Sequence, residues 1–199
     1  MKKIVLNACG VKSLGGLKLF LESFDFFSKT DSKIFVLYSE VEFYKDLNNQ
    51  FYENPRVKFY KTTNKRYLHP FLNYFLPNKI VEEINNSDAI IHFGNFGFKT
   101  LKKSFVLIQN ILPLVKRGVR NSILKVLINR SMKLSNFILI QLDHLKEDID
   151  KKFHSKIIQI GETTSSEVEI SNKSGKIVFF GSDVAVSYTH LRAHETLDN

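Results

Sequence analysis

Short runs of apolar residues alternate along this chain with segments in which apolar residues recur every three or four positions. The continuous runs predict buried strands, at residues 4–6, 33–38, 57–60, 88–93, 104–109, 137–142, 156–160 and 176–181. The helical spacing predicts helices at residues 17–27, 41–51, 78–85, 121–134 and 145–153. Continuous apolar strands that alternate with helices are typical of a parallel sheet with both faces covered. We therefore expect an α/β fold: a Rossmann-like parallel sheet with helices on both faces.

A polar segment rich in Ser, Thr, Asn and Gly interrupts this alternation at residues 162–175 and predicts a linker. We expect one Rossmann-like domain over residues 1–161 before it. The apolar run KIVFFG follows, so residues 176–185 are expected to begin a second domain.

The last residues read as foreign sequence. Residues 186–196, VSYTHLRAHET, match the translation of a transposase sequencing adapter, and we expect residues 186–199 to be a non-native tail. The protein's own sequence is then expected to be cut off near Ala185. His190 and His194, which have the spacing of a helical metal pair, carry no functional weight on this interpretation.

Composition indicates a cellular location but does not identify the class of binding partner. The 199 residues carry a formal net charge of +9, which suits nucleic acid, an anionic membrane or a phosphate-bearing substrate. The single cysteine, Cys9, cannot form an internal disulfide, and no apolar run is long enough to span a membrane. A cytoplasmic protein is expected.

The glycine pair at Gly15 and Gly16 lies between the first strand and the first predicted helix. Backbone N–H groups without side chains at a helix start can bind an anion, usually a phosphate. A tight turn that only packs two elements is an equal alternative. The sequence matches neither the dinucleotide-binding pattern G-x-G-x-x-G nor the P-loop.

Polar residues follow two of the later predicted strands. His92 and Asn95 lie at the end of the run DAIIHF and in the loop after it, and Gln109 and Asn110 end the run SFVLIQN. These side chains suit hydrogen bonds to sugar hydroxyls, and a protonated His92 would pair with phosphate. A half-buried structural histidine and a turn cap are the alternatives. No metal-binding cluster and no Ser-His-Asp order stands out.

Two basic stretches allow further interpretations. Aromatic residues interleave with Lys65 and Arg66 over residues 64–77, which suits stacking on sugars or nucleobases, or a helix that packs on the core. Basic residues between Lys116 and Lys133, which include Arg117 and Arg120, suit a peripheral approach to anionic lipid or form a solvated face.

The order of these motifs resembles the N-terminal half of retaining glycosyltransferases of GT-B fold, of the group 1 or family 4 type. The resemblance runs from LNACGVKSLGGLKLFLESF through DAIIHFGNFG, SFVLIQNILPL and FILIQLDHLKEDIDKKF to KIIQIGE, and it covers essentially residues 2–182. It implies that the linker leads into a second Rossmann-like domain that holds acidic donor-binding residues, most of which this chain lacks.

The resemblance also implies roles for individual residues. Gly15 and Gly16 would line the cleft near the donor diphosphate, and His92 with Asn95 would match an H-x-x-N-like loop near the reacting sugar, with His92 as the catalytic residue. Gln109 and Asn110 stand where the family often has a histidine followed by a polar residue, and they would bind substrate. No metal and no cofactor is expected.

These expectations lead to one function and two alternatives. The intact enzyme would transfer a sugar from a nucleotide-sugar donor to a glycan or lipid-linked acceptor in cell-surface polysaccharide synthesis, and the present chain would be inactive alone. It would be cytoplasmic, with peripheral contact to the inner face of the membrane through Lys116, Arg117 and Arg120. The alternatives are a basic nucleic-acid-binding module, although no such partner is expected, and a sugar-nucleotide epimerase of GT-B fold.

Overall fold

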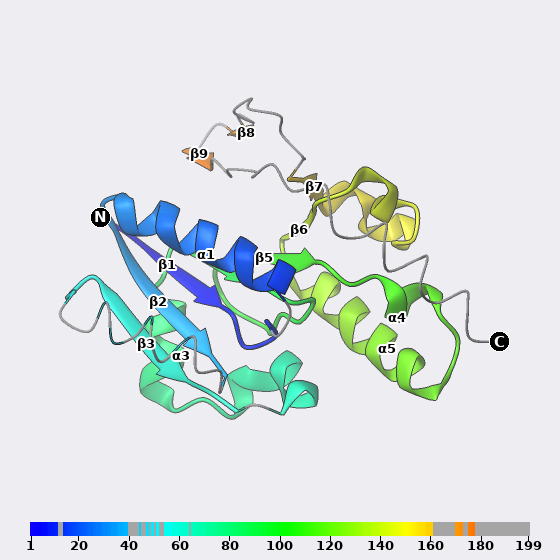
Figure 1. The fold of residues 1–199 in the computed structure, drawn as a ribbon, viewed down its shortest axis with the longest axis horizontal. Helices are drawn as coiled ribbons and strands as arrows, with labels where there is room; N and C mark the ends of the chain where they lie inside the picture. Colours follow the sequence, from blue (N-terminus) through cyan, green and yellow to red (C-terminus); the bar gives the residue numbers. More distant parts are fainter. Residues whose placement is uncertain are drawn as a thin grey trace.

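The computed structural model describes residues 1–11, 14–39, 44, 47, 49, 51, 54–63, 65–160, 170–172 and 175–177. A seven-stranded sheet runs in the order β3-β2-β1-β4-β5-β6-β7, and all its paired strands are parallel (Figure 1). Its strands are β1 (Lys2–Asn7), β2 (Ser32–Tyr38), β3 (Val57–Lys61), β4 (Ala89–His92), β5 (Lys103–Ile108), β6 (Phe137–Ile140) and β7 (Ile157–Gln159). The predicted Rossmann-like α/β class is confirmed.

Helices cover both faces of this sheet. The helix α1 (Leu14–Lys29) lies on one face, where Phe20 and Phe24 pack in one core cluster with Leu6 and Ile91. The other face is covered by the 3₁₀ helix η1 (Arg66–Tyr74), by α3 (Asn78–Asn85) and by α5 (Val119–Leu134), and a separate core cluster there contains Ile128. Shorter elements are α4 (Leu112–Val115) and the 3₁₀ helices η2 (Asp143–Lys146) and η3 (Lys151–Lys156).

Some element boundaries differ from the predicted ones. The helix α1 begins three residues before the predicted start at Leu17, so Gly15 and Gly16 belong to its first turn and not to a preceding loop. The helix α5 begins at Val119, two residues before the predicted start, and the Asn121 side chain donates to the carbonyl of Arg117, which precedes the helix.

The helix predicted at residues 145–153 is wrong. Two 3₁₀ helices stand there, and Asp150 separates them, because its Oδ1 accepts a hydrogen bond at 3.1 Å from the backbone N–H of Lys152 and so starts η3. Such local side-chain bonds compete with a continuous helix. The aromatic segment 64–77 does form a packed helical element, η1.

Some predicted segments lie largely outside the described residues. Of the helix predicted at residues 41–51, three described positions are helical. Most of the predicted linker, second-domain strand and foreign tail is likewise outside the described residues. Within them, β8 (Ile170–Asn172) and β9 (Gly175–Ile177) form an antiparallel pair.

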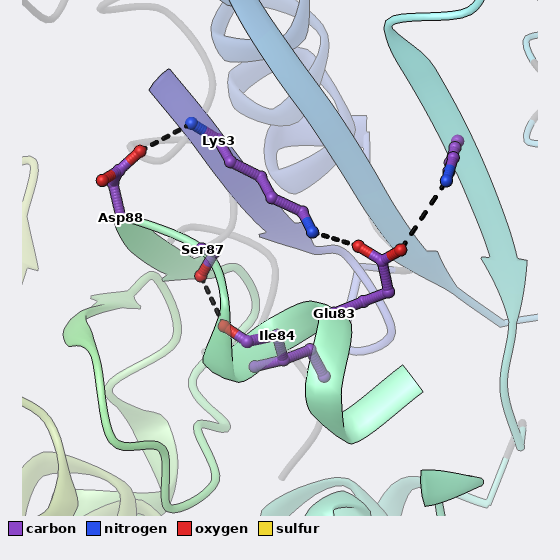
Figure 2. A network of polar contacts seen from close by, with 6 residues as sticks. Lys3, Glu83, Ile84, Ser87 and Asp88 are labelled. Atoms are coloured by element: carbon purple, nitrogen blue, oxygen red, sulfur yellow. Dashed lines mark hydrogen bonds and ion pairs between the residues drawn. The ribbon is translucent and has the colours of Figure 1, made fainter. Parts of the chain in front are cut away.

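A polar network ties the amino-terminal edge of the sheet together (Figure 2). The Lys3 backbone N–H donates to Asp88 at 2.7 Å, and its ammonium group pairs with Glu83 of α3. Lys58 of β3 lies 3.6 Å from the same carboxylate. The hydrogen bond from Lys3, with the charge of Lys58, lowers the pKa of Glu83. This network lies at the strand starts, so it stabilises the edge opposite to the one considered next.

Candidate functional site

The strand order reverses between β1 and β4, and the loops that follow these strands leave from the carboxyl edge at this point. In open α/β sheets this switch point is where ligands bind. Here the two loops touch: a Cβ atom at Gly10 would lie 2.9 Å from the carbonyl oxygens of both Phe93 and Gly94. Gly94 has φ +81° and meets the Gly10 backbone equally closely. The glycines therefore allow direct backbone packing, and the space between these loops is filled.

The first turn of α1 stands beside this packed loop pair. Figure 1 shows the amino-terminal end of α1 at the carboxyl edge of the sheet, where the strand arrows end. Gly15 and Gly16 occupy this turn, and Gly16 is buried. The first N–H groups of a helix point away from its own acceptors and carry the positive end of the dipole. Gly15 and Gly16 thus lie at a helix start, and the anion binding predicted for them stays a prediction.

His92 is completely buried at the end of β4. Its Nδ1 lies 2.9 Å from Nδ2 of Asn7 on β1, and the Phe98 ring meets it edge to face at 4.8 Å between centroids. Burial lowers the pKa of His92 to about 3, because a charged imidazole loses its hydration there. The ring is therefore neutral at physiological pH, and a phosphate-pairing imidazolium is not available in this arrangement.

The hydrogen bonds of Asn7 define the tautomer of His92. Asn7 Oδ1 accepts from the Cys9 N–H at 3.3 Å, so its Nδ2 faces the imidazole and donates. His92 Nδ1 is then the acceptor, and the neutral ring carries its proton on Nε2. Within the described part of the chain, Nε2 has no hydrogen-bond partner.

His92 faces away from α1. Its neighbour Phe93 packs against Phe20 of α1, whereas Phe98, which touches the His92 ring, belongs to the core cluster on the opposite face. The structure therefore brings His92 to the same strand ends as Gly15 and Gly16 but on the other side of the sheet. Contact with a substrate would require the packing of Phe98 to open.

Asn95 joins the loop that follows β4 to the loop that follows β5. Its backbone has φ 73°, and its Oδ1 accepts from the N–H groups of Gln109 and Asn110 at 2.7 and 3.2 Å. Its Nδ2 donates to the Asn110 carbonyl at 2.6 Å. The structure thus brings Asn95 to Gln109 and Asn110, which lie 14 and 15 positions later in the sequence. The Asn95 amide is occupied by backbone and shapes the loop.

Gln109 and Asn110 are the more accessible members of this group. The Asn110 side chain is exposed, and its Oδ1 accepts from the Leu112 N–H at 3.0 Å at the start of α4. The Gln109 side chain is partly exposed and makes no hydrogen bond to any described residue. Gln109 therefore offers a carbonyl and an amide group that are available to a ligand.

Asn7, Gly10 and Gly94 are not among the site residues predicted from the sequence. Asn7 follows the apolar run of β1 as a polar residue at a strand end, which is the signal that selected His92. Gly10 and Gly94 show only as glycines in loops. Within the described residues no group of His, Cys, Asp or Glu could hold a metal ion. No helix in the described part of the chain has the length and apolar character needed to cross a bilayer.

Comparison with known proteins gives a likeness in fold alone. No family model and no curated protein sequence matches the chain. The chain is similar to a crystal structure of Anabaena HepE in complex with UDP and glucose, with TM-score 0.51 and 13% identity. The match covers 81% of this chain and 44% of the HepE chain. An alpha-glucosyltransferase (AGT) in complex with UDP matches 80% of this chain and 40% of its own, with TM-score 0.43 and 11% identity. The chain spans less than half the length of either structure, and its Rossmann-like fold is one that a UDP- and glucose-bound protein shares.

Proposed function

We propose that residues 1–161 are the N-terminal Rossmann-like domain of a GT-B glycosyltransferase. The intact enzyme would transfer a sugar from a nucleotide-sugar donor to a glycan or lipid-linked acceptor in cell-surface polysaccharide synthesis. One observation carries this proposal: the fold, a seven-stranded parallel sheet whose order reverses between β1 and β4, is similar over 81% of the chain to the HepE structure that holds UDP and glucose. The partial coverage of that structure agrees with a second domain that supplies the rest of the cleft.

Three groups at the carboxyl edge have distinct tasks in this proposal. The backbone of Gly15 and Gly16 in the first turn of α1 faces the donor diphosphate, because N–H groups and the helix dipole favour negative charge. Gln109 and Asn110 bind sugar hydroxyls. Asn95 acts on substrate only through the loop that it holds.

His92 has a positioning role in this proposal. Its hydrogen bond to Asn7 joins the ends of β1 and β4, and its neutral, buried ring cannot exchange a proton with an acceptor without opening the core. The sequence-based assignment of His92 as the catalytic residue is therefore the less favoured form of the proposal.

In this proposal the domain contributes to catalysis by electrostatic stabilisation of the leaving group. In sugar transfer the bond between the anomeric carbon and the donor phosphate oxygen breaks, and the acceptor oxygen bonds to that carbon and loses its proton. The nucleoside diphosphate leaves with the electron pair of the broken bond. Preorganised backbone N–H groups stabilise that developing charge without covalent chemistry.

Ligand-induced shifts of backbone amide NMR signals test the binding part of this proposal. UDP-glucose should shift the amide signals of Gly15, Gly16, Gln109 and Asn110. The amide of Gly118, which lies in an open loop, is the internal control. No shift with any nucleotide sugar, or shifts confined to residues outside the carboxyl edge, contradicts the assigned site.

Turnover tests the enzymatic part. The chain and a version extended by the genomic sequence that follows Ala185 would be assayed against a panel of nucleotide sugars with glycan and lipid-linked acceptors. We expect release of nucleoside diphosphate by the extended protein alone. An extended protein that epimerises the sugar without any acceptor would favour the epimerase, and one without turnover would contradict the proposal.

A further inference from the structure

The helix α5 exposes a row of aliphatic side chains. Val119, Ile123 and Val126 are 81, 57 and 66% exposed, and their spacing of four and three residues places them on one stripe of the helix. Leu112 and Val115 of α4 add two more side chains, 46 and 48% exposed.

This row is left uncovered because α5 packs on the protein mainly through its second half. Its buried residues are Ile128, Ser131 and Met132, all in the second half of the helix. Figure 1 shows α4 and the first turns of α5 at the far side of the molecule from β1, β2 and β3. The helix is therefore anchored by its end, and its start extends beyond the sheet. We name the five exposed residues Leu112, Val115, Val119, Ile123 and Val126 the α4–α5 face.

The net charge of the chain is concentrated in the sequence segment that contains this face. Of the 29 basic residues, nine lie between positions 89 and 142, and none of the 20 acidic residues does. The remaining residues carry 20 charges of each sign, so this segment accounts for the whole formal charge of +9. Lys116, Arg117 and Arg120 lie between the aliphatic residues and are exposed. Arg117 and Arg120 form no ion pair within the described residues.

One further contact extends the row. Arg130, one turn beyond Val126 on the same stripe, donates to the Pro70 carbonyl at 2.7 Å and lies over the Phe71 ring at 4.5 Å. These contacts hold η1 beside α5. The exposed aromatic side chains of this neighbouring segment are Tyr67, Tyr74 and Phe75, at 60, 66 and 61%.

We infer that the α4–α5 face inserts its aliphatic side chains into an anionic lipid bilayer while Lys116, Arg117 and Arg120 contact the headgroups. Burial of aliphatic side chains among acyl chains favours membrane binding, and the attraction of basic residues to an anionic surface strengthens it further. A groove for nucleic acid would place aromatic or hydrogen-bonding side chains where these aliphatic ones stand. The segment 89–142 holds no acidic residue over 54 positions, so none of its own side chains repels the lipid charge. The inference stands independently of the sugar-transfer proposal.

A tryptophan reporter gives the sharpest test, because the chain contains no Trp. In an Ile123→Trp variant, fluorescence should shift to the blue when vesicles of phosphatidylcholine with phosphatidylglycerol are added. Leu101→Trp is the matched control: Leu101 is 79% exposed and lies outside the α4–α5 face. Its fluorescence should not shift. Equal shifts at both positions, or none at position 123, overturn the inference.

Flotation of the unmodified chain with the same vesicles provides a second readout. Exchange of Arg117 and Arg120 for Gln should weaken partition about fivefold per charge at low salt. The triple variant Val119→Ser, Ile123→Ser, Val126→Ser should lose vesicle binding and keep its circular dichroism spectrum. Three results would contradict a bilayer as occupant: undiminished binding of the triple variant, equal binding to neutral vesicles, and a concentration-dependent blue shift without lipid, which would indicate self-association.

Discussion

Acidification should destabilise this protein through His92. Burial lowers the pKa of its imidazole from 6.5 to about 3 in the folded state, whereas the unfolded chain has the ordinary value. Between these two values the unfolded state binds a proton that the folded state does not. The free energy of unfolding must therefore fall as the pH falls through this window. Above it the ring is neutral in both states, and below about pH 3 the loss is complete.

The size of the effect follows from the width of that window. Each pH unit within it changes the free energy of unfolding by about 1.4 kcal/mol, so the loss between pH 7 and pH 5 is about 2 kcal/mol. A domain of ordinary stability has about 5–15 kcal/mol in total. The hydrogen bond from Asn7 acts in the same direction, because a proton on Nδ1 would face the Asn7 amide donor.

Urea unfolding from pH 5 to pH 8 measures this loss in the parent chain and in His92→Asn. An asparagine side chain does not titrate, and its carbonyl can still accept from Asn7. Loss of ring volume beside Phe98 costs about 1–3 kcal/mol at every pH. His144→Asn, at an exposed position, controls for the loss of one histidine. The variant should lose the steep part of the pH dependence, and an unchanged slope in His92→Asn would refute the reasoning.

Other substitutions address the packing of the site and the opposite edge. Asn95→Ala should cost about 2–4 kcal/mol and speed hydrogen exchange at the two backbone amides that Asn95 Oδ1 holds; unchanged exchange would exclude the clamp. Gly94→Ala should lose at least about 2 kcal/mol more in urea unfolding than Gly118→Ala. Both glycines have positive φ, but of the two only Gly94 would bring a Cβ against backbone, at 2.7 Å. Equal losses of stability would mean that backbone strain alone causes them and that the close contact adds nothing. Glu83→Gln should lower stability by at most about 1 kcal/mol at pH 7. Because the hydrogen bond from Lys3 lowers the pKa of Glu83, this gap should close as the pH falls through the range in which carboxyl groups titrate, and a gap that persists would contradict the ion pair with Lys3.

The sheet was predictable because its inner parallel strands are largely buried on both faces and appear in the sequence as continuous apolar runs. The same property hid the orientation of His92. In the run DAIIHF both neighbours of the histidine are apolar, so no polar and apolar alternation shows which side of the sheet it faces. Only its contacts with Asn7 and Phe98 place it away from α1.

The exposed row on α5 was hidden for a related reason. The helix carries apolar residues around much of its circumference, so Ile123, Leu124 and Ile128 look equally suited to a core. Burial separates them: Ile128 is completely buried and Ile123 is 57% exposed. The difference arises from how far the helix extends past the sheet, which is a property of the tertiary arrangement and not of local spacing.

The candidate site combines polar side chains that are accessible with polar side chains that bond to the protein itself, and this division affects how activity data should be interpreted. His92 forms its hydrogen bond with Asn7, and Asn95 forms its hydrogen bonds with the loop at Gln109. A loss of activity after substitution of His92 or Asn95 would therefore follow from a displaced carboxyl edge. Gln109 differs, because its side chain contributes no internal hydrogen bond within the described residues. A Gln109→Ala variant that keeps the parent's unfolding curve but loses ligand affinity would therefore indicate direct contact. The same loss in Asn95→Ala would not, unless stability were unchanged as well.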